Sequence, residues 1–266
     1  MNIQHADIKL TGVLVVYEPI SREYAEKVFK KFIASIGISY RILIVNNGPD
    51  LKINDILGTN DNSEFSGWDE GLNSIVNDGS QVYILANDTF CIRNTWGPFK
   101  RKKFRRAVIK ASHIGKKMAA GEITYIKNPF MVNGLLSRMW IRTHIFVLSS
   151  SALHGLKKIS LDKTTLSNIA TLGSEEKLIW GLGISENLKA RISDWLYPAE
   201  NSFGWYKSRL VSNQIKLKKA HAIINEKWLA AKLNSINCEF IDCGNGYLTK
   251  FIMNTYSTFR QRILKI

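Results

Sequence analysis

The stretch that decides the fold of this chain is Val82-Tyr83-Ile84-Leu85-Ala86-Asn87-Asp88-Thr89-Phe90. Its first five residues are apolar and rich in β-forming types, which predicts a buried strand. The strand must end at Asn87 and Asp88, because an amide and a carboxylate cannot continue a core. Ligands bind beyond the carboxyl ends of strands in parallel α/β sheets, so we expect Asp88 to hold a divalent metal or a sugar hydroxyl. The alternative is an Asx turn that only terminates the strand.

Two earlier segments have the same form, since residues 11–19 and 41–48 are each an apolar strand that ends on polar residues. Between them, Tyr24, Val28, Phe32 and Ile36 recur at every fourth position, which predicts an amphipathic helix over residues 23–36. Strand, helix and strand form a βαβ unit whose two strands run parallel. The segment 62–73 is a polar loop that leads into a short helix, and its glycines allow a ligand to approach the backbone closely.

This order of elements resembles the nucleotide-sugar-binding half of GT-A fold glycosyltransferases, especially glycosyltransferase family 2 and the rhamnosyltransferase-like enzymes of bacterial surface polysaccharide synthesis. The resemblance is carried by Val16-Tyr17-Glu18, Asn46-Asn47-Gly48-Pro49-Asp50, the loop 62–71 and Ala86-Asn87-Asp88. It covers residues 10–95 in detail and the rest only by the order of elements. It implies an α/β fold, with a GT-A, Rossmann-like catalytic domain over residues 1–185 and a mainly helical C-terminal region over residues 186–266.

The resemblance also implies a donor site for a nucleotide sugar at the strand ends and in the loop. Its expected residues are Tyr17, Glu18, Asn46, Asn47, Gly67, Trp68, Asp69, Asn87 and Asp88. Asp88 falls on the family's Asp-x-Asp motif, which implies Mg²⁺ or Mn²⁺ at that carboxylate. The chain departs from the family pattern at Asn46, where many members have an aspartate, and at Ala86, where the motif has its first acid. One carboxylate binds a divalent ion weakly, so donor phosphates would have to supply further ligands.

On the acceptor side, residues 139–149 predict a strand that runs into a helix near Ser150. In the family this strand and helix line the acceptor, so the resemblance makes Arg142, Thr143 and His144 candidates for binding the acceptor or a phosphate. A lone histidine beside an apolar run is more often structural than catalytic, which is the alternative for His144.

A general base completes the expected site. Inverting family members use a carboxylate near the helix after the acceptor strand to take the proton of the attacking hydroxyl, which points to Glu175 or Glu176, with Asp69 as an alternative. The run Ser174-Glu175-Glu176 also fits a helix N-cap followed by acidic first-turn residues.

The charge is strongly unbalanced, with 37 Lys and Arg against 22 Asp and Glu. The excess is clustered in residues 100–106 and 207–219, and a clustered positive surface attracts a polyanion. The first cluster, flanked by Phe99 and containing Phe104, fits docking on an anionic membrane face, and a plain solvated face is the alternative. We expect no nucleic-acid partner, because no helix-turn-helix, zinc-finger spacing or RNP-like strand accompanies the charge.

Length and composition complete the picture, since 266 residues with 45% hydrophobic residues can bury a sizeable core. No run approaches the roughly 20 apolar residues of a membrane span, and residues 1–7 lack the layout of a signal peptide. We therefore expect a cytoplasmic protein, peripheral on the inner face of the cell membrane. The number of cysteines is odd, with Cys91, Cys238 and Cys243, which predicts reduced thiols.

Together with the resemblance, these features predict an inverting hexosyl- or deoxyhexosyltransferase. Its acceptor would be a glycan, such as lipid-linked O-antigen, capsule or lipooligosaccharide. The alternative is a non-catalytic GT-A-like protein or a basic nucleic-acid-binding protein. After residue 189 the pattern predicts two helices: one with Leu217, His221, Ile224, Trp228 and Ala231 on a single face, and a last one at 247–264.

Overall fold

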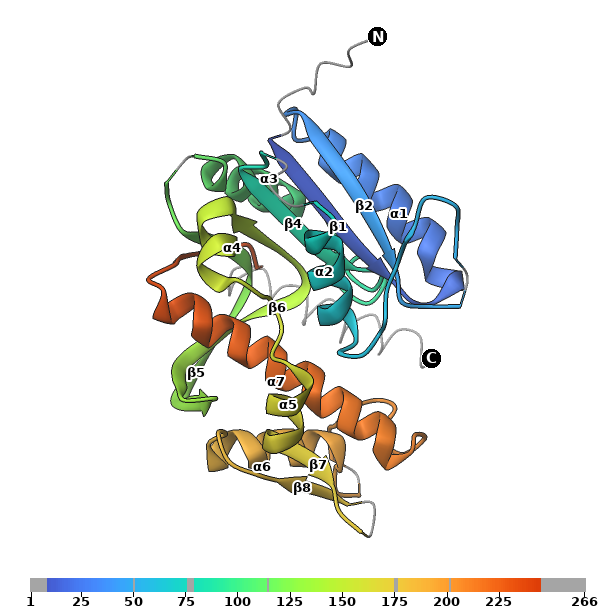
Figure 1. Cartoon of the computed structure of the whole chain (residues 1–266), viewed down its shortest axis with the longest axis vertical. Coiled ribbons are helices and arrows are strands. Elements are labelled where there is room, and N and C mark those ends of the chain that lie inside the picture. The colour runs from blue at the N-terminus through green and yellow to red at the C-terminus, as the bar shows by residue number, and fades with distance from the viewer. Residues whose placement is uncertain are drawn as a thin grey trace, which may run out of the picture.

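The computed structural model describes residues 9–49, 51–75, 79–113, 115–174, 177–200 and 202–244. Their centre is a seven-stranded sheet in the order β3-β2-β1-β4-β6-β5-β9 (Figure 1). Only β6 runs against the common direction of the other six strands. The strands are β1 (Leu10–Val16), β2 (Tyr40–Asn46), β3 (Ile56–Leu57), β4 (Val82–Asn87), β5 (Met118–Val132), β6 (Leu135–Ser149) and β9 (Glu239–Asp242).

Helices cover both faces of this sheet, and a small sheet of β7 (Ala170–Leu172) and β8 (Leu178–Trp180) lies beyond it. The helices are α1 (Pro19–Ala34), α2 (Glu64–Asn73), α3 (Pro98–Ala111), α4 (Ser150–Leu156), α5 (Lys163–Ile169), α6 (Glu186–Leu196) and α7 (Asn213–Ser235). One core cluster contains α1 and α3, and the other contains α2 and α4 to α7. The chain is therefore a mixed α/β protein with a mostly parallel sheet, which confirms the expected α/β class and is compatible with a Rossmann-like fold.

The first half of the chain follows the sequence prediction closely. The three predicted strands form β1, β2 and β4, and β1 pairs in parallel with both of the others. The predicted helix between β1 and β2 forms as α1, but it begins at Pro19, four residues earlier than expected. Proline is favourable there, because the first turn of a helix leaves its N–H groups unpaired in any case.

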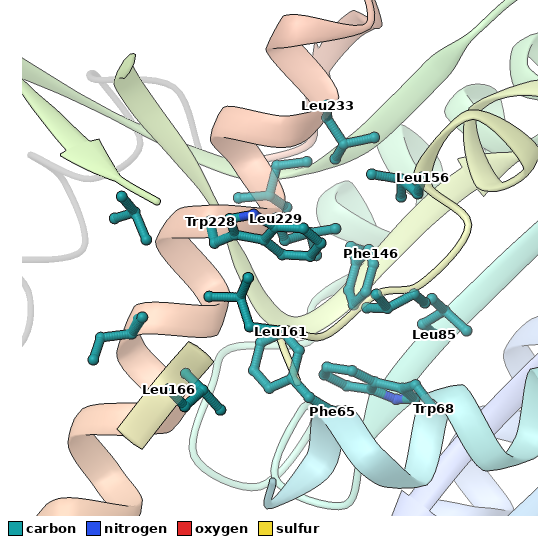
Figure 2. Close-up of a cluster of buried hydrophobic side chains, with 14 of the residues drawn as sticks. Phe65, Trp68, Leu85, Phe146, Leu156, Leu161, Leu166, Trp228, Leu229 and Leu233 are labelled. Atoms are coloured by element: carbon teal, nitrogen blue, oxygen red, sulfur yellow. The ribbon is translucent and has the colours of Figure 1, made fainter. Parts of the chain in front are cut away.

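Strand β1 is buried along its whole length, as expected for a parallel strand covered on both faces. Val13 and Val15 point into one core cluster, while Leu10, Leu14 and Val16 point into the other. Figure 2 shows the cluster that contains α2 and α7, where Trp228 and Leu229 of α7 and Phe146 of β6 lie near Phe65 and Trp68 of α2. Helix α7 is therefore part of the main core.

The C-terminal half differs from the prediction at one place and adds one strand that was not predicted. The run 178–180 forms strand β8, so the alternative of a capped helix beginning at residues 174–176 is wrong. The region after residue 185 is not only helical, because β9 returns to the main sheet beside β5. The predicted strand at 139–149 and the helix from Ser150 are confirmed as β6 and α4. The last predicted helix, at 247–264, lies outside the described residues.

Among the described residues, no helix combines the length and the apolar character needed to cross a membrane.

Candidate functional site

The polar ends of β1, β2 and β4 meet at one edge of the sheet, as the sequence predicts. The register pairs Val16 with Asn46 and Val15 with Asn87, so Tyr17, Asn46 and Asn87 end neighbouring strands. Tyr17 is 54% exposed, which leaves its ring open to a ligand. We refer to Tyr17, Glu18 and the ends of β2 and β4 as the strand-end site.

Asp88 lies within this site but is only 4% exposed. Its Oδ2 accepts hydrogen bonds from the backbone N–H groups of Tyr17 at 2.9 Å and Glu18 at 3.0 Å, and from the hydroxyl of Ser21 at 3.1 Å. The carboxylate therefore joins the end of β4 to the β1–α1 connection and sets the position of Tyr17. The Asx-type hydrogen bond falls instead on Asn87, whose Oδ1 accepts from the N–H of Thr89 at 3.2 Å.

Asn46, the last residue of β2, and Asn47 also shape the loop that follows the strand. Asn46 Oδ1 accepts from the N–H of Gly48 at 2.7 Å, and Asn47 Nδ2 donates to the carbonyl of Ser63 at 2.8 Å. Gly48 approaches β1 so closely that an added Cβ would lie 2.2 Å from the carbonyl oxygen of Tyr17. This contact explains why the loop needs glycine at this position and keeps the two strand ends together.

Three expected donor residues lie on α2, where each has a structural contact. Trp68 is fully buried, donates its indole N–H to the carbonyl of Ala86 at 3.0 Å and stacks edge-on against Phe146, so its role is core packing. Gly67 lies beneath β1, where an added Cβ would be 2.9 Å from a methyl group of Val15. Trp68 is therefore a core residue, because α2 packs against the sheet. An added Cβ at Gly67 would also lie 3.1 Å from Oδ1 of Asn47, so Gly67 lies next to the strand-end site.

Asp69 is the third of these residues. Its carboxylate accepts from the N–H of Ile159 at 2.8 Å, and from the N–H and hydroxyl of Ser160. Burial raises the pKa of Asp69, and the three hydrogen bonds offset this only in part. Asp69 thus anchors the segment after α4 and contacts neither Asp88 nor the ends of β1 and β2 by any described hydrogen bond.

The predicted acceptor residues follow the end of β4 on the neighbouring strand β6, because Ala86 pairs with Ile145. His144 and Thr143 contact opposite faces of the sheet. His144 Nε2 lies 2.8 Å from Glu122 Oε1, which is also ion-paired with Lys100 of α3. Burial alone would raise the pKa of Glu122, but His144 and Lys100 outweigh it and lower the pKa to about 2.

Thr143 contacts the α7 side, where its hydroxyl donates to Glu226 Oε2 at 3.2 Å. Glu226 Oε1 is paired with Lys227 at 2.6 Å. Burial favours a higher pKa for Glu226, but Lys227, Lys219 and the N–H of Thr143 together lower it. Arg142 is exposed beside this group. The acceptor candidates therefore do not form a single contact surface.

Sequence reasoning did not identify four residues that contact the expected site residues or border the strand-end site, namely Glu122, Glu226, Arg93 and Tyr206. Arg93 follows β4, bonds the hydroxyl of Tyr206 and lies 3.5 Å from Glu18 Oε1. Its guanidinium also lies 5.0 Å from the centroid of the Tyr206 ring. These residues border the strand-end site, but Arg93 and Tyr206 are 113 positions apart, so only the tertiary fold reveals the contact.

A cavity of about 1040 Å³ lies at the opposite edge of the sheet. Its walls come from the residues before β4, the end of β6 and helix α4, and Asp69 is the one expected site residue that lines it. Glu175 and Glu176 lie outside the described residues. Within the described part of the chain, no group of three or more His, Cys, Asp or Glu side chains could hold a metal ion.

Comparisons of this chain with protein-family models, with curated proteins and with solved structures found no match.

Proposed function

We propose that the protein is a glycosyltransferase that moves a sugar from a nucleotide-sugar donor to a glycan acceptor. The observation that carries the proposal is the strand-end site, where exposed Tyr17 lies beside the polar ends of three parallel strands. Ligands of α/β sheets bind at this edge. The strand β6 continues past the same edge, which supplies a second surface for an acceptor.

In this proposal the ring of Tyr17 stacks on the nucleotide base, an interaction that tolerates any base. Glu18, Asn46, Asn47 and Asn87 surround the donor. Asp88 uses Oδ2 for three internal hydrogen bonds, which leaves Oδ1 as the oxygen that could face Mg²⁺ or Mn²⁺. The ion would then take its other ligands from the donor diphosphate and water, which is common for Mg²⁺. A bound cation would offset the negative charge of that diphosphate.

The acceptor is proposed to lie along β6 beside Arg142 and Thr143, on the face that carries α7, while His144 contacts Glu122 on the other face. Inverting transfer requires a base that removes the proton of the attacking hydroxyl. Glu122 and Glu226 are poor bases, because their cationic neighbours lower the pKa of each carboxyl. Asp69 is engaged in anchoring the segment after α4. The resemblance therefore leaves Glu175 or Glu176 as the proposed base of a hexosyl- or deoxyhexosyltransferase.

The proposal is tested by a thermal-shift screen with uridine, thymidine, guanosine and cytidine diphosphates, each with and without Mn²⁺. One of them should raise the melting temperature, because a ligand that binds only the folded state stabilises it. Transfer to a lipid-linked glycan is then assayed with sugars on that nucleotide. If no nucleotide shifts the melting temperature and the protein binds RNA or DNA at physiological salt, a nucleic-acid-binding protein replaces the proposal.

Helix α3 supports the proposed location on the cytoplasmic face of the membrane. Lys100 is buried against Glu122, and Lys103 bonds the carbonyl of Gly244. Lys110 is ion-paired with Glu239, and four further cations are exposed at the surface of the helix: Arg101, Lys102, Arg105 and Arg106. Phe99, 79% exposed, adds an apolar side chain at one end of this row. Such a surface suits an anionic leaflet, and co-sedimentation with phosphatidylserine vesicles should fall when the four exposed cations become glutamine.

A further inference from the structure

Four basic side chains gather where β6, α6 and α7 come together, and we call them the basic corner: Arg142, Arg191, Lys219 and Lys227. Trp140 of β6 lies among them. Lys227 Nζ is 3.5 Å from the centroid of the Trp140 ring, and the guanidinium carbon of Arg191 is 5.4 Å from it. Cations are attracted to the face of an indole, so Trp140 holds two of the four charges in place.

The charges of the basic corner are not balanced. Glu226 is the only carboxylate that is ion-paired with any of the four residues in the part of the chain that the structure describes. The charge of Lys219 also attracts the Glu226 carboxylate and helps to lower its pKa. Arg142 and Arg191 have no ion pair with a described residue, and both are exposed. Four cations around one carboxylate leave an excess of positive charge that is open to solvent.

Burying the charged ammonium group of Lys227 in this cluster is unfavourable, and the fold does not require a lysine at this position. Lys227 is 5% exposed, and its burial lowers the pKa of its ammonium group despite the nearby Glu226. Arg191 and Arg142 lower it further by repulsion. Apolar residues of similar size could fill the same place without this penalty. A buried lysine whose pKa is lowered by burial and by neighbouring cations is a candidate functional group.

The location of the basic corner indicates which substrate it serves. Glu226 links the corner to Thr143, which lies next to the end of β4 on the acceptor strand. Tyr17, the proposed base-stacking residue, directly follows β1, which lies on the other side of β4 from β6. An anion in the corner would therefore lie on the acceptor side of the strand-end site.

We propose that the basic corner binds a phosphate or diphosphate group of the acceptor substrate. One guanidinium group can donate two parallel hydrogen bonds to two phosphate oxygens, and a lysine ammonium adds a compact positive charge. Two arginines and two lysines therefore suit a phosphate or diphosphate group. The assignment to the acceptor rests on the proposed glycosyltransferase function. The same chemistry is present in the donor diphosphate, and the experiment must separate the two sources.

The experiment is isothermal titration of the full chain with three probes: inorganic pyrophosphate, farnesyl diphosphate, and the nucleoside diphosphate that responds in the thermal-shift screen. The variants are Arg191→Gln and Lys219→Gln, whose side chains reach the surface. Lys218→Gln is the matched control, because Lys218 is the exposed neighbour of Lys219 on α7 and has no described contact with the corner. Far-UV circular dichroism verifies that each variant is folded.

Both variants should weaken binding of pyrophosphate and farnesyl diphosphate at least tenfold, while Lys218→Gln keeps wild-type affinity and the nucleoside diphosphate binds all proteins equally. An equal loss in Lys218→Gln would mean nonspecific attraction and would overturn the proposal, as would absence of pyrophosphate binding to the wild type. A loss confined to the nucleoside diphosphate would assign the corner to the donor and overturn the acceptor assignment. Binding of farnesyl diphosphate through the corner, with no nucleotide bound anywhere, would support the phosphate site and refute the proposed transferase.

Discussion

The buried carboxylates near the parallel strands β1 and β4 and those around the antiparallel strand β6 are held by different kinds of partner. On the side of the parallel strands, Asp69 and Asp88 accept hydrogen bonds from backbone N–H groups and serine hydroxyls. Around the antiparallel strand β6, Glu122 and Glu226 are held by lysine and histidine side chains. The first kind of contact fixes the path of the chain, and the second concentrates cations.

This difference has consequences for acidity. Backbone and hydroxyl donors do not compensate for the burial of Asp69, so its pKa is raised. Cationic partners more than compensate for the burial of Glu122, so its pKa falls to about 2. The comparison teaches that backbone contacts hold the chain in place at the proposed donor site, while the carboxylates around β6 gather positive charge beside the proposed acceptor site.

The largest effect is expected at Asp88. Replacing Asp88 by alanine leaves the donors of Tyr17, Glu18 and Ser21 without their acceptor, and we expect the free energy of unfolding to fall by about 3 kcal/mol. Urea unfolding measures the change. Asn87→Ala is the control, because Asn87 only bonds Thr89 two positions away, and it should cost about 1 kcal/mol or less. Equal losses in both variants would show that Asp88 does not join β4 to β1.

The second prediction concerns Glu122 in acid. Its pKa in the folded protein, about 2, lies below its ordinary value of 4.5. The stability that Glu122 contributes is therefore present above pH 4.5 and is lost as the pH falls from 4.5 toward 2. The loss should be at most about 3 kcal/mol, and less after solvent screening. Unfolding of the wild type and Glu122→Gln across this range measures it, and a constant difference between them would contradict the ion-pair account.

The smallest effect is expected at Asp69, with the opposite sign. Because its pKa is raised, the folded state favours the protonated form, and the contribution of Asp69 falls as the pH rises through that pKa. At pH 7, Asp69→Asn should cost about 1 kcal/mol, since one acceptor oxygen remains. The stability difference from wild type should shrink with rising pH for Asp69→Asn and shrink with falling pH for Glu122→Gln. If both stability differences changed with pH in the same direction, the distinction between the Asp69 and Glu122 carboxylates would be wrong.

The sequence predicted the parallel half of the fold because local signals determine it. Apolar runs of strand length ending on Tyr17, Asn46 and Asn87 are enough to place three strands and their shared edge. Trp68 was misassigned because a polar, glycine-containing segment is typical of a loop, while the close contact of Gly67 with β1 that draws α2 into the core appears only in three dimensions.

The partners of the site carboxylates could not be predicted either. Asp88 meets Tyr17 across 71 positions and Thr143 meets Glu226 across 83, so no local pattern encodes these contacts. The basic cluster 100–106 was visible in the sequence, but the burial of Lys100 against Glu122 was not. Charge clusters are readable from sequence, whereas the choice of which charges are paired depends on the packing of α3 against the sheet.

The most direct test of the account is calorimetric titration of wild type, Tyr17→Ala and Tyr24→Ala with the nucleoside diphosphate found in the screen. Tyr24, on α1, is 57% exposed and so matches Tyr17 in type and exposure, but it lies outside the strand-end site. Loss of base stacking should weaken binding to Tyr17→Ala by about tenfold or more, and Tyr24→Ala should bind as the wild type does. Wild-type affinity in Tyr17→Ala would contradict the placement of the donor at the strand ends.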